Sequence, residues 1–273
     1  MKPFIKWAGG KTQLLKEIQN NLPDTYNNYY EPFLGGGAVL LYLKPKYAYV
    51  NDLNNELINT YKQVKNDSKG LLILLENHKK NHSKEYYYSM RNLDRNSELY
   101  NQLSDVEKAA RFIYLNKTCY NGMYRVNKKN QFNVPIGSYK NPTIYNQELI
   151  KDISCYLNEN QVNFYNYDFE RFLKLPQQGD FVYLDPPYDP VSVTSSFTSY
   201  QVNGFTKDDQ IRLKCACDQL NNRNVKFMLS NSDTSFINDL YKNYKIIKVK
   251  AKRNINSKAD KRSPINEVII MNY

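Results

Sequence analysis

Residues 29–52 place two strand-like segments, a glycine turn and an acid in an order that few folds accommodate. The pattern predicts that residues 29–37 form a strand leading into the turn Gly35-Gly36-Gly37. A helix through Leu40, Leu41 and Leu43 follows, and then a second strand over 47–52 that ends in Asp52. Such a run opens a nucleotide-binding βαβ unit, whose acid accepts hydrogen bonds from ribose hydroxyls. A glycine turn that only packs helix on sheet would give the same pattern, so the segment alone leaves both possibilities open.

A rigid corner follows another predicted strand. Phe181-Val182-Tyr183-Leu184 is a short apolar run typical of a buried parallel strand, and Asp185-Pro186-Pro187-Tyr188 comes directly after it. Two successive prolines cannot continue a sheet ladder or a helix interior. Ligands of open α/β sheets bind at the carboxyl ends of the strands, so we expect this acid and ring to hold a planar, amine-bearing substrate. The alternative is a turn that the prolines merely stiffen.

The rest of the chain indicates an α/β protein with an insertion. Residues 55–120 are polar and helical in pattern, with a capping box at Ser104-Asp105-Val106-Glu107, and 117–140 is loop-like. Strand signals return at 162–165, 225–229, 244–250 and 265–272, and a helix opens near Thr206. We therefore predict a Rossmann-like, mostly parallel sheet in a domain of residues 1–55 and 146–273. Residues 56–145 form the predicted inserted helical domain.

The amino-acid composition limits the classes of molecule that the protein is expected to bind. The net charge of +11 and 41% hydrophobic residues indicate a globular protein that favours a polyanion such as nucleic acid. Cys119, Cys155, Cys215 and Cys217 show no zinc-type pairing, and His78 and His82 are interpreted as part of a solvated helix face, so we expect no metal. Without a signal-like or membrane-spanning run, we expect a cytosolic, cytoplasmic protein that does not contact membranes.

The N-terminal segment supplies a second set of candidates. Gly9-Gly10-Lys11-Thr12 resembles the end of a phosphate-binding loop, but Ile5 stands where that motif requires glycine. A hydrophobic wall at Trp7 and a cation at Lys11 for a carboxylate fit better. With the ribose-binding acid and a planar-base site, these features suggest S-adenosylmethionine as cofactor. Asp168 could hold its adenine amino group beside Phe169, or could simply cap a helix ahead of a core ring.

The rigid corner then has a chemical task. The exocyclic amine of adenine is a poor nucleophile because its lone pair is delocalised into the ring. Asp185 and the Pro186 carbonyl can accept hydrogen bonds from that amine, Pro187 keeps the corner rigid, and the Tyr188 ring can stack on the base. Catalysis by such a site depends mainly on positioning and electrostatics.

These motifs, in this order, resemble a Dam-type DNA adenine-N6 methyltransferase. The resemblance covers nearly the whole chain and points to the DpnII-like branch of the D12 class, the alpha group, in which the cofactor motif precedes the catalytic motif. Its segments are Lys6-Trp7-Ala8-Gly9-Gly10-Lys11, Glu31-Pro32-Phe33-Leu34-Gly35-Gly36-Gly37, Asn51-Asp52, Asp168-Phe169, Asp185-Pro186-Pro187-Tyr188 and Thr198-Ser199-Tyr200. Tyr120-Asn121-Gly122-Met123-Tyr124-Arg125 and Phe132-Asn133-Val134-Pro135-Ile136-Gly137 resemble the family's recognition hairpin for GATC.

The resemblance implies roles for individual residues. The cofactor site would include Trp7, Lys11, Phe33, Gly35, Gly37, Asp52, Asp168, Phe169 and Asp185. Duplex DNA would contact Tyr120, Asn121, Met123, Arg125, Asn127, Lys128, Asn133, Pro135, Ser196 and Tyr200. Arg125 would read guanine, Tyr120 and Asn121 would steady the duplex, and Pro135 would meet a thymine methyl. Ser138 departs from the pattern because relatives have arginine there, so a phosphate contact would be lost.

Two mobile parts are predicted around the DNA. Residues 192–200 would close over an adenine flipped out of the duplex, unless they are an ordinary connection. The basic stretch from Lys250 to Arg262 would lie near DNA or form a disordered tether.

Other functions remain possible at this stage. They are methylation of another amine in RNA, cytosine or protein glutamine, adenine methylation at a different DNA sequence, and a non-catalytic DNA-binding protein on the same fold. We expect a monomer, which could serve beside a cognate restriction endonuclease without touching it.

Overall fold

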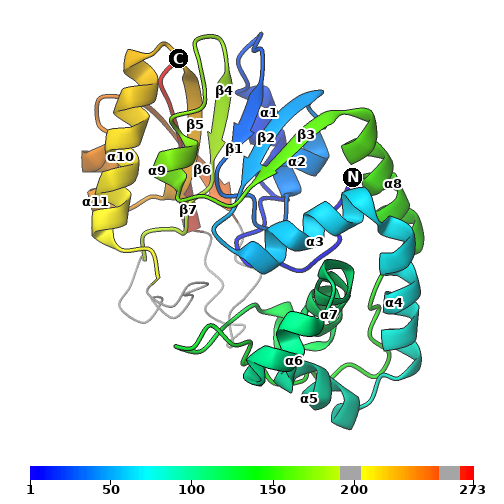
Figure 1. The fold of residues 1–273 in the computed structure, drawn as a ribbon. Coiled ribbons are helices and arrows are strands. Elements are labelled where there is room, and N and C mark those ends of the chain that lie inside the picture. The colour runs from blue at the N-terminus through cyan, green and yellow to red at the C-terminus, as the bar shows by residue number, and fades with distance from the viewer. Residues whose placement is uncertain (191–203, 252–264) are drawn as a thin grey trace.

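A computed structural model describes residues 1–190, 204–251 and 265–273 of the chain. Seven strands form one sheet in the order β3-β2-β1-β4-β5-β7-β6 (Figure 1). The strands are β1 (Tyr29–Glu31), β2 (Tyr47–Asn51), β3 (Gln161–Tyr165), β4 (Phe181–Leu184), β5 (Lys226–Ser232), β6 (Lys245–Ala251) and β7 (Ile265–Met271). The first five pair in parallel, and β7 runs antiparallel between β5 and β6. The predicted mostly parallel α/β fold is confirmed.

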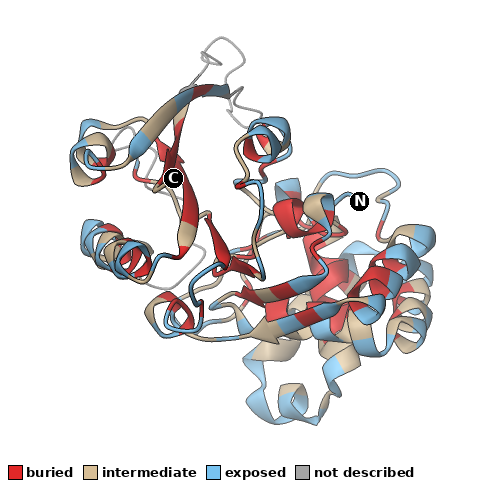
Figure 2. Cartoon of the chain, turned by 90° about the horizontal axis from the view of Figure 1, so that it is seen from above, coloured by how far each residue is buried: buried red, intermediate tan, exposed pale blue. Residues whose placement is uncertain are grey.

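Alternation along the strands builds two separate cores. Phe181 and Tyr183 of β4 pack on one face of the sheet, whereas Val182 and Leu184 pack on the other. The first face carries α1 (Leu15–Asn20), α2 (Ala38–Leu43) and α8 (Gln147–Glu159); the second carries α9 (Phe169–Phe172), α10 (Lys207–Asn222) and α11 (Ser235–Leu240) (Figure 1). Figure 2 shows buried residues concentrated in the central strands and on the inner sides of these helices. Burial of both faces explains why the strands are continuous apolar runs in the sequence.

Five helices connect β2 with α8 and extend away from the sheet (Figure 1). They are α3 (Asn55–Asn66), α4 (Ser68–Lys80), α5 (Lys84–Asn92), α6 (Ser97–Gln102) and α7 (Asp105–Thr118). The capping box predicted at Ser104 is present at the start of α7, and a second one at Thr206 begins α10. One apolar cluster continues from the sheet through α3 into α7, so these helices share a core with the sheet.

The interpretation of the two histidines as a solvated face is wrong for His78. Its side chain is buried, and its ring stacks on Tyr114 of α7 at a centroid distance of 4.9 Å. Its Nδ1 lies 2.7 Å from the Tyr86 hydroxyl, and burial lowers the pKa of His78 to about 4. His82, which is half-buried, also contacts Tyr114, with its Nδ1 2.9 Å from the hydroxyl. The exposed Asn and Lys residues between the two histidines hid these inward contacts from the sequence interpretation.

Arg111 of α7 ties the helical segment together. Its guanidinium is 2% exposed and lies 2.9 Å from Asp94 and 3.5 Å from Glu56 of α3. It also donates to the main-chain carbonyls of Met90 and Arg91. Asp94 in turn accepts a hydrogen bond from the main-chain N–H of Phe132 at 2.8 Å, in the loop that follows α7. The charge of one arginine therefore orders three helices and that loop.

We expect Arg111→Ala to lower the free energy of unfolding by about 3–5 kcal/mol, because it leaves two carboxylates without their buried cation. Urea unfolding followed by far-UV circular dichroism measures the change. Lys80→Ala, at an exposed lysine of α4, is the control and should change stability by less than about 0.5 kcal/mol. Equal midpoints for the two variants would contradict the role assigned to Arg111.

Candidate active site

The strand order reverses between β1 and β4, and the candidate site lies where these two strands end. The crossovers after β1 and β4 lead to helices on opposite faces of the sheet, which opens a crevice at the carboxyl ends. Glu31 closes β1, Asp52 follows β2 and Asp185 follows β4. Acids therefore stand at the carboxyl ends of three adjacent strands. The sequence predicted this position for Asp52 and Asp185, because each follows a strand-like run.

Asp185 forms an ion pair with Lys11 inside this crevice. The Lys11 Nζ lies 2.8 Å from Asp185 Oδ1, and the lysine also donates to the Gly9 carbonyl at 2.8 Å. Burial raises the pKa of Asp185 to about 6, and the Lys11 cation limits the rise. The sequence interpretation placed Lys11 against a cofactor carboxylate; in this structure its partner is the protein's own acid.

The Tyr188 ring completes the corner. Lys11 Nζ lies 4.4 Å from the centre of that ring, and the Tyr188 hydroxyl donates to Glu267 of β7 at 2.7 Å. A cation at one side and a hydrogen bond at its tip hold the aromatic ring beside Asp185. Sequence reasoning did not find Glu267, because it lies 79 residues from Tyr188 in an otherwise ordinary strand.

The two prolines differ in what their carbonyls contact. Pro187 accepts a hydrogen bond of 2.9 Å from the buried side chain of Gln210 in α10. The side-chain oxygen of Gln210, Oε1, accepts in turn a hydrogen bond of 3.1 Å from the side-chain amide of Asn231 in β5. Within the described part of the chain, no such partner contacts the Pro186 carbonyl. The corner is therefore braced from behind through Pro187, and the Pro186 carbonyl keeps its acceptor capacity. The sequence also did not predict Gln210 or Asn231 as part of the site.

Asp52 fixes the glycine turn. One carboxylate oxygen accepts from the Gly35 N–H at 2.9 Å and the other from the Asn54 N–H at 2.9 Å. Burial raises the pKa of Asp52, and these two hydrogen bonds oppose the rise. Each carboxylate oxygen has more than one acceptor position, so both can still bind hydroxyl groups of a ligand.

The glycines of the turn allow close packing. Gly35 and Gly37 have φ angles of +48° and +65°, which side-chain-bearing residues rarely adopt. A Cβ at Gly35 would lie 2.8 Å from the Trp7 ring, and one at Gly37 would collide with the Tyr61 hydroxyl. Glycine is therefore required here both for backbone conformation and for space.

Trp7 joins the turn to the helical segment. Its indole stacks on Tyr124 at 5.4 Å and lies 6.3 Å from Phe112 of α7. The hydrophobic wall expected at Trp7 thus packs on the glycine turn at one side and on residues 112–124 at the other.

Phe33 and Phe169 form an aromatic group with Phe205. Phe33 lies 5.6 Å from Phe169 and 5.9 Å from Phe205, measured between ring centres. The sequence did not predict Phe205 as a site residue, because no motif near it indicates that it lies beside Phe33 and Phe169. The sequence order does not reveal such contacts.

Asp168 serves as a helix cap. Its carboxylate accepts from the Glu170 N–H at 2.9 Å at the start of α9, and it pairs with Arg212 of α10 at 3.3 Å. The helix-capping alternative is therefore present in the structure, with Phe169 as the buried ring behind it. The Asp168 side chain is 45% exposed, so it stays accessible while it caps the helix.

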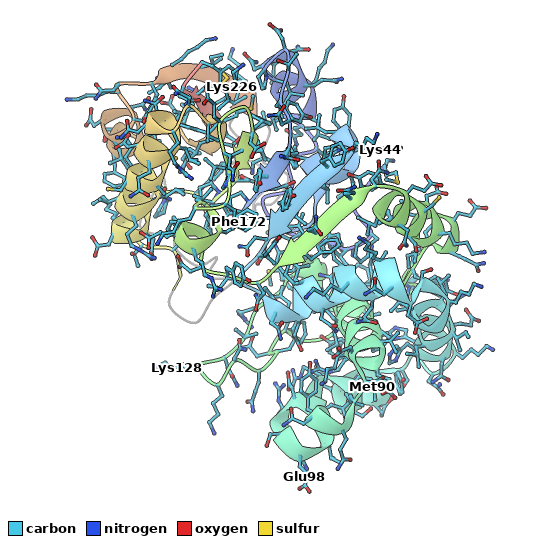
Figure 3. All side chains as sticks on the ribbon, turned by 45° about the horizontal axis from the view of Figure 1, so that its top comes forward. Lys44, Met90, Glu98, Lys128, Phe172 and Lys226 are labelled. Atoms are coloured by element: carbon cyan, nitrogen blue, oxygen red, sulfur yellow. The ribbon has the colours of Figure 1, made fainter. Side chains whose placement is uncertain are left out.

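Residues 120–137 form a hairpin-like loop, which we call the hairpin. Val126 bridges to Phe132, and Asn127 closes the tip by accepting from the N–H groups of Lys129 and Gln131. Lys128 projects at that tip, far from Lys44 and Lys226, which lie near the amino ends of the strands (Figure 3). The hairpin and the carboxyl ends of the strands therefore occupy the same end of the molecule.

The hairpin alternates inward and outward side chains. Tyr124, Phe132 and Val134 are buried against the helices, whereas Arg125 and Pro135 are exposed. The outward set also includes Tyr120, Asn121 and the half-buried Asn133, whereas Met123 is half-buried and packs against the core. Arg125 Nε donates to Asn133 Oδ1 at 2.8 Å, so these two candidates contact each other. Asn127 is used within the turn itself.

The hairpin carries positive charge. Its basic residues are Arg125, Lys128 and Lys129, and residues 117–140 contain no acidic residue. Lys117 lies before the hairpin, in the last turn of α7, and burial, then the nearby Lys6, lowers its pKa to about 8. Ser138 is exposed. The segment 192–200, with Ser196 and Tyr200, lies outside the described residues. Of the basic stretch from Lys250 to Arg262, only Lys250 and Ala251 belong to the part of the chain that the structure describes.

A family model described as "D12 class N6 adenine-specific DNA methyltransferase" matches residues 7–255. The chain belongs to this family. Type II methyltransferase M1.LlaDCHI of Lactococcus lactis subsp. cremoris is 49% identical to it over 273 residues, covering 100% of this chain and 96% of that protein. Type II methyltransferase M.MjaIII of Methanocaldococcus jannaschii is 46% identical over 294 residues, covering 100% and 99%.

A further relative is the DNA adenine methylase of Escherichia coli strain K12. It is 32% identical over 280 residues, which cover 99% of this chain and 95% of that enzyme. The methyltransferase is thus an enzyme that methylates adenine N6 in DNA, and such enzymes generally take the methyl group from S-adenosylmethionine. The resemblance is confirmed for the D12 class, and this activity is favoured over a non-catalytic role.

No described helix is both long and apolar enough to span a bilayer. Within residues 1–190, 204–251 and 265–273, acids, histidines and cysteines do not gather in threes that could hold a metal ion.

Proposed function

We propose that the methyltransferase recognises GATC in duplex DNA and methylates its adenine after flipping the base into the crevice at Asp185. The observation that carries this proposal is the outward row of the hairpin, with Arg125 beside Asn133 and Pro135, at the same end of the molecule as the crevice. The resemblance of these hairpin segments to GATC readers supports the sequence assignment, and grouping with the DpnII-like branch of the D12 class is part of the same proposal. Residues 56–145 would be the target-recognition domain.

The crevice suits S-adenosylmethionine by its donors and its space. Asp52 would accept the ribose hydroxyls, and the turn at Gly35 and Gly37 would let the backbone approach the ligand. Phe33 and Phe169 would contact the adenine ring, with Asp168 near its amino group. Trp7 would form the wall beside the turn, and Lys11 would act through Asp185. The bound cofactor supplies a methyl group that is activated by its positive sulfur.

The corner would align the target amine and hold it. Asp185 and the Pro186 carbonyl would accept its two N–H groups, and this concentrates electron density on the nitrogen. Tyr188 would stack on the base, while Gln210 keeps Pro187 in place. As the new carbon–nitrogen bond forms, the carbon–sulfur bond breaks. The nitrogen then sheds one proton, which ionised Asp185 or water can take.

The hairpin would divide DNA recognition between bases and backbone. The terminal nitrogens of Arg125 match the acceptor edge of guanine in the major groove, because Asn133 engages only Nε. Exposed Lys128 and the half-buried Asn127 would meet phosphates. Tyr120, half exposed, and Asn121, with a φ of +54°, would enter the duplex where the target base leaves, next to Met123. Monomeric action, without contact to a restriction endonuclease, belongs to the same proposal.

The direct test is transfer of labelled methyl from S-adenosylmethionine to two duplexes that differ by one base within GATC. We expect the GATC duplex to be labelled about 5- to 150-fold faster, since each mismatched base pair costs about 1–3 kcal/mol. Hydrolysis of the product should show the label on adenine. Equal labelling of both duplexes would contradict the GATC assignment, while leaving adenine methylation intact.

We expect Arg125→Ala to cost about 1–3 kcal/mol of discrimination at the guanine of the site, because its base contact is lost. Rates on duplexes with substituted guanine measure this. Lys128→Ala is the control: it should weaken binding to all duplexes alike and lower the salt dependence, because it contacts phosphate. Unchanged selectivity of Arg125→Ala would exclude it as the guanine reader.

We expect the rate of methyl transfer to fall about tenfold per pH unit below about pH 6, where Asp185 becomes protonated. A protonated carboxyl presents a donor to an amine that needs an acceptor. Single-turnover rates between pH 5 and 8.5 measure the profile. Lys11→Met should move the acidic limb to higher pH, since the cation is what limits the pKa of Asp185. A flat profile down to pH 5 would contradict an ionised Asp185.

A further inference from the structure

The last strand brings an acid to the catalytic corner from the far side. β7 runs antiparallel to β5, so its first residues lie at the carboxyl end of the parallel strands. Glu267 pairs there with Ser232, the last residue of β5. A parallel strand in the same place would present its final residues instead. The reversal of β7 is what delivers Glu267 to Tyr188.

Tyr188 is held between two side chains of opposite charge. Its hydroxyl donates to the Glu267 Oε2 at 2.7 Å, and Lys11 lies 4.4 Å from its ring centre. Lys11 also pairs with Asp185. The orientation of the ring is therefore restrained at its hydroxyl by Glu267 and at its face by Lys11.

We propose that Glu267 is a positioning residue of the methyltransferase, which orients the Tyr188 ring so that the target base stacks beside Asp185. The proposal rests on the proposed function of Tyr188. A hydrogen bond to an ionised acceptor is shorter and stronger than a neutral one, so a carboxylate restrains the phenol more firmly than a hydroxyl or amide would. Glu267 also adds a negative charge behind the corner.

Several charged or titratable groups lie around this corner. They are Lys11 from the N-terminal loop, Glu31 at the end of β1, Tyr183 of β4, Tyr188, and Glu267 of β7. Burial raises the pKa of Glu31 to about 8, so it titrates above Asp185. Glu267 raises the pKa of Asp185, and its removal should therefore ease the ionisation of Asp185.

The test is a double-mutant cycle with Tyr188→Phe, which keeps the ring, and Glu267→Ala, which removes the acceptor. Any duplex that the wild type labels can serve as substrate, so the result does not depend on GATC. We expect each variant to lower kcat about tenfold, and the double variant to be no slower than either, because all three lose the same hydrogen bond. The dissociation constant of S-adenosylmethionine, measured by calorimetry without DNA, should stay within about twofold in each.

Glu267→Gln separates acceptor from charge. Its amide oxygen can still accept from Tyr188, so most of kcat at pH 8 should return, while the acidic limb of the profile moves to lower pH. Asn266→Ala is the matched control, at the exposed neighbour on the same strand. It should leave kcat, the cofactor affinity and the pH profile as in the wild type.

Two results would overturn the role of Glu267. One is a double variant that is about a hundredfold slower, since independent effects multiply. The other is a Glu267→Gln profile with an unmoved acidic limb. If Glu267→Ala weakens cofactor binding as much as it lowers kcat, the substitution disturbs the fold of the site. In that case Glu267→Gln and Tyr188→Phe decide whether Glu267 positions the Tyr188 ring. A wild type that labels only duplexes lacking GATC would refute the proposed sequence and leave this test intact.

Discussion

The burial of a carboxylate next to a lysine is the interaction on which the site depends. An ionised acid at the end of a buried strand loses most of its hydration, and that loss raises its pKa. Lys11 offsets part of this cost at 2.8 Å, so Asp185 can carry charge near neutral pH. The strand order makes the pair possible, because Asp185 ends β4 while the N-terminal loop reaches the same crevice.

The crevice is a consequence of chain topology. β1 and β4 are neighbours in the sheet, with Tyr29 opposite Phe181, although about 150 residues separate them. Their following segments leave toward opposite faces, so no crossover covers the strand ends between them. The glycine turn after β1 and the proline corner after β4 then meet across this gap. Each is stiff for a different reason: Asp52 accepts from the turn, and Gln210 donates to the corner.

The sequence predicted those parts of the site that lie directly after a strand or at a helix start. Asp52, Asp185, the capping box at Ser104 and the helix start near Thr206 are local features, because strand and helix periods identify the residues beside them. Contacts across long separations had no such signal. Glu267, Gln210 and Phe205 come from segments that each look ordinary, and pairing through a hydrogen bond or a ring contact has no sequence period. His78 shows the reverse error, since polar neighbours hid a buried position.

The alternation along the hairpin assigns anchoring to the helices and contact at the surface to different residues. Tyr124, Phe132 and Val134 anchor it to the helices, while Arg125 and Pro135 face away. Substitutions at outward positions therefore change what the loop contacts without removing what holds it in place. A protein built in this way can acquire a different target by exchanging alternate residues of one short segment, and its core need not be repacked to accommodate the change.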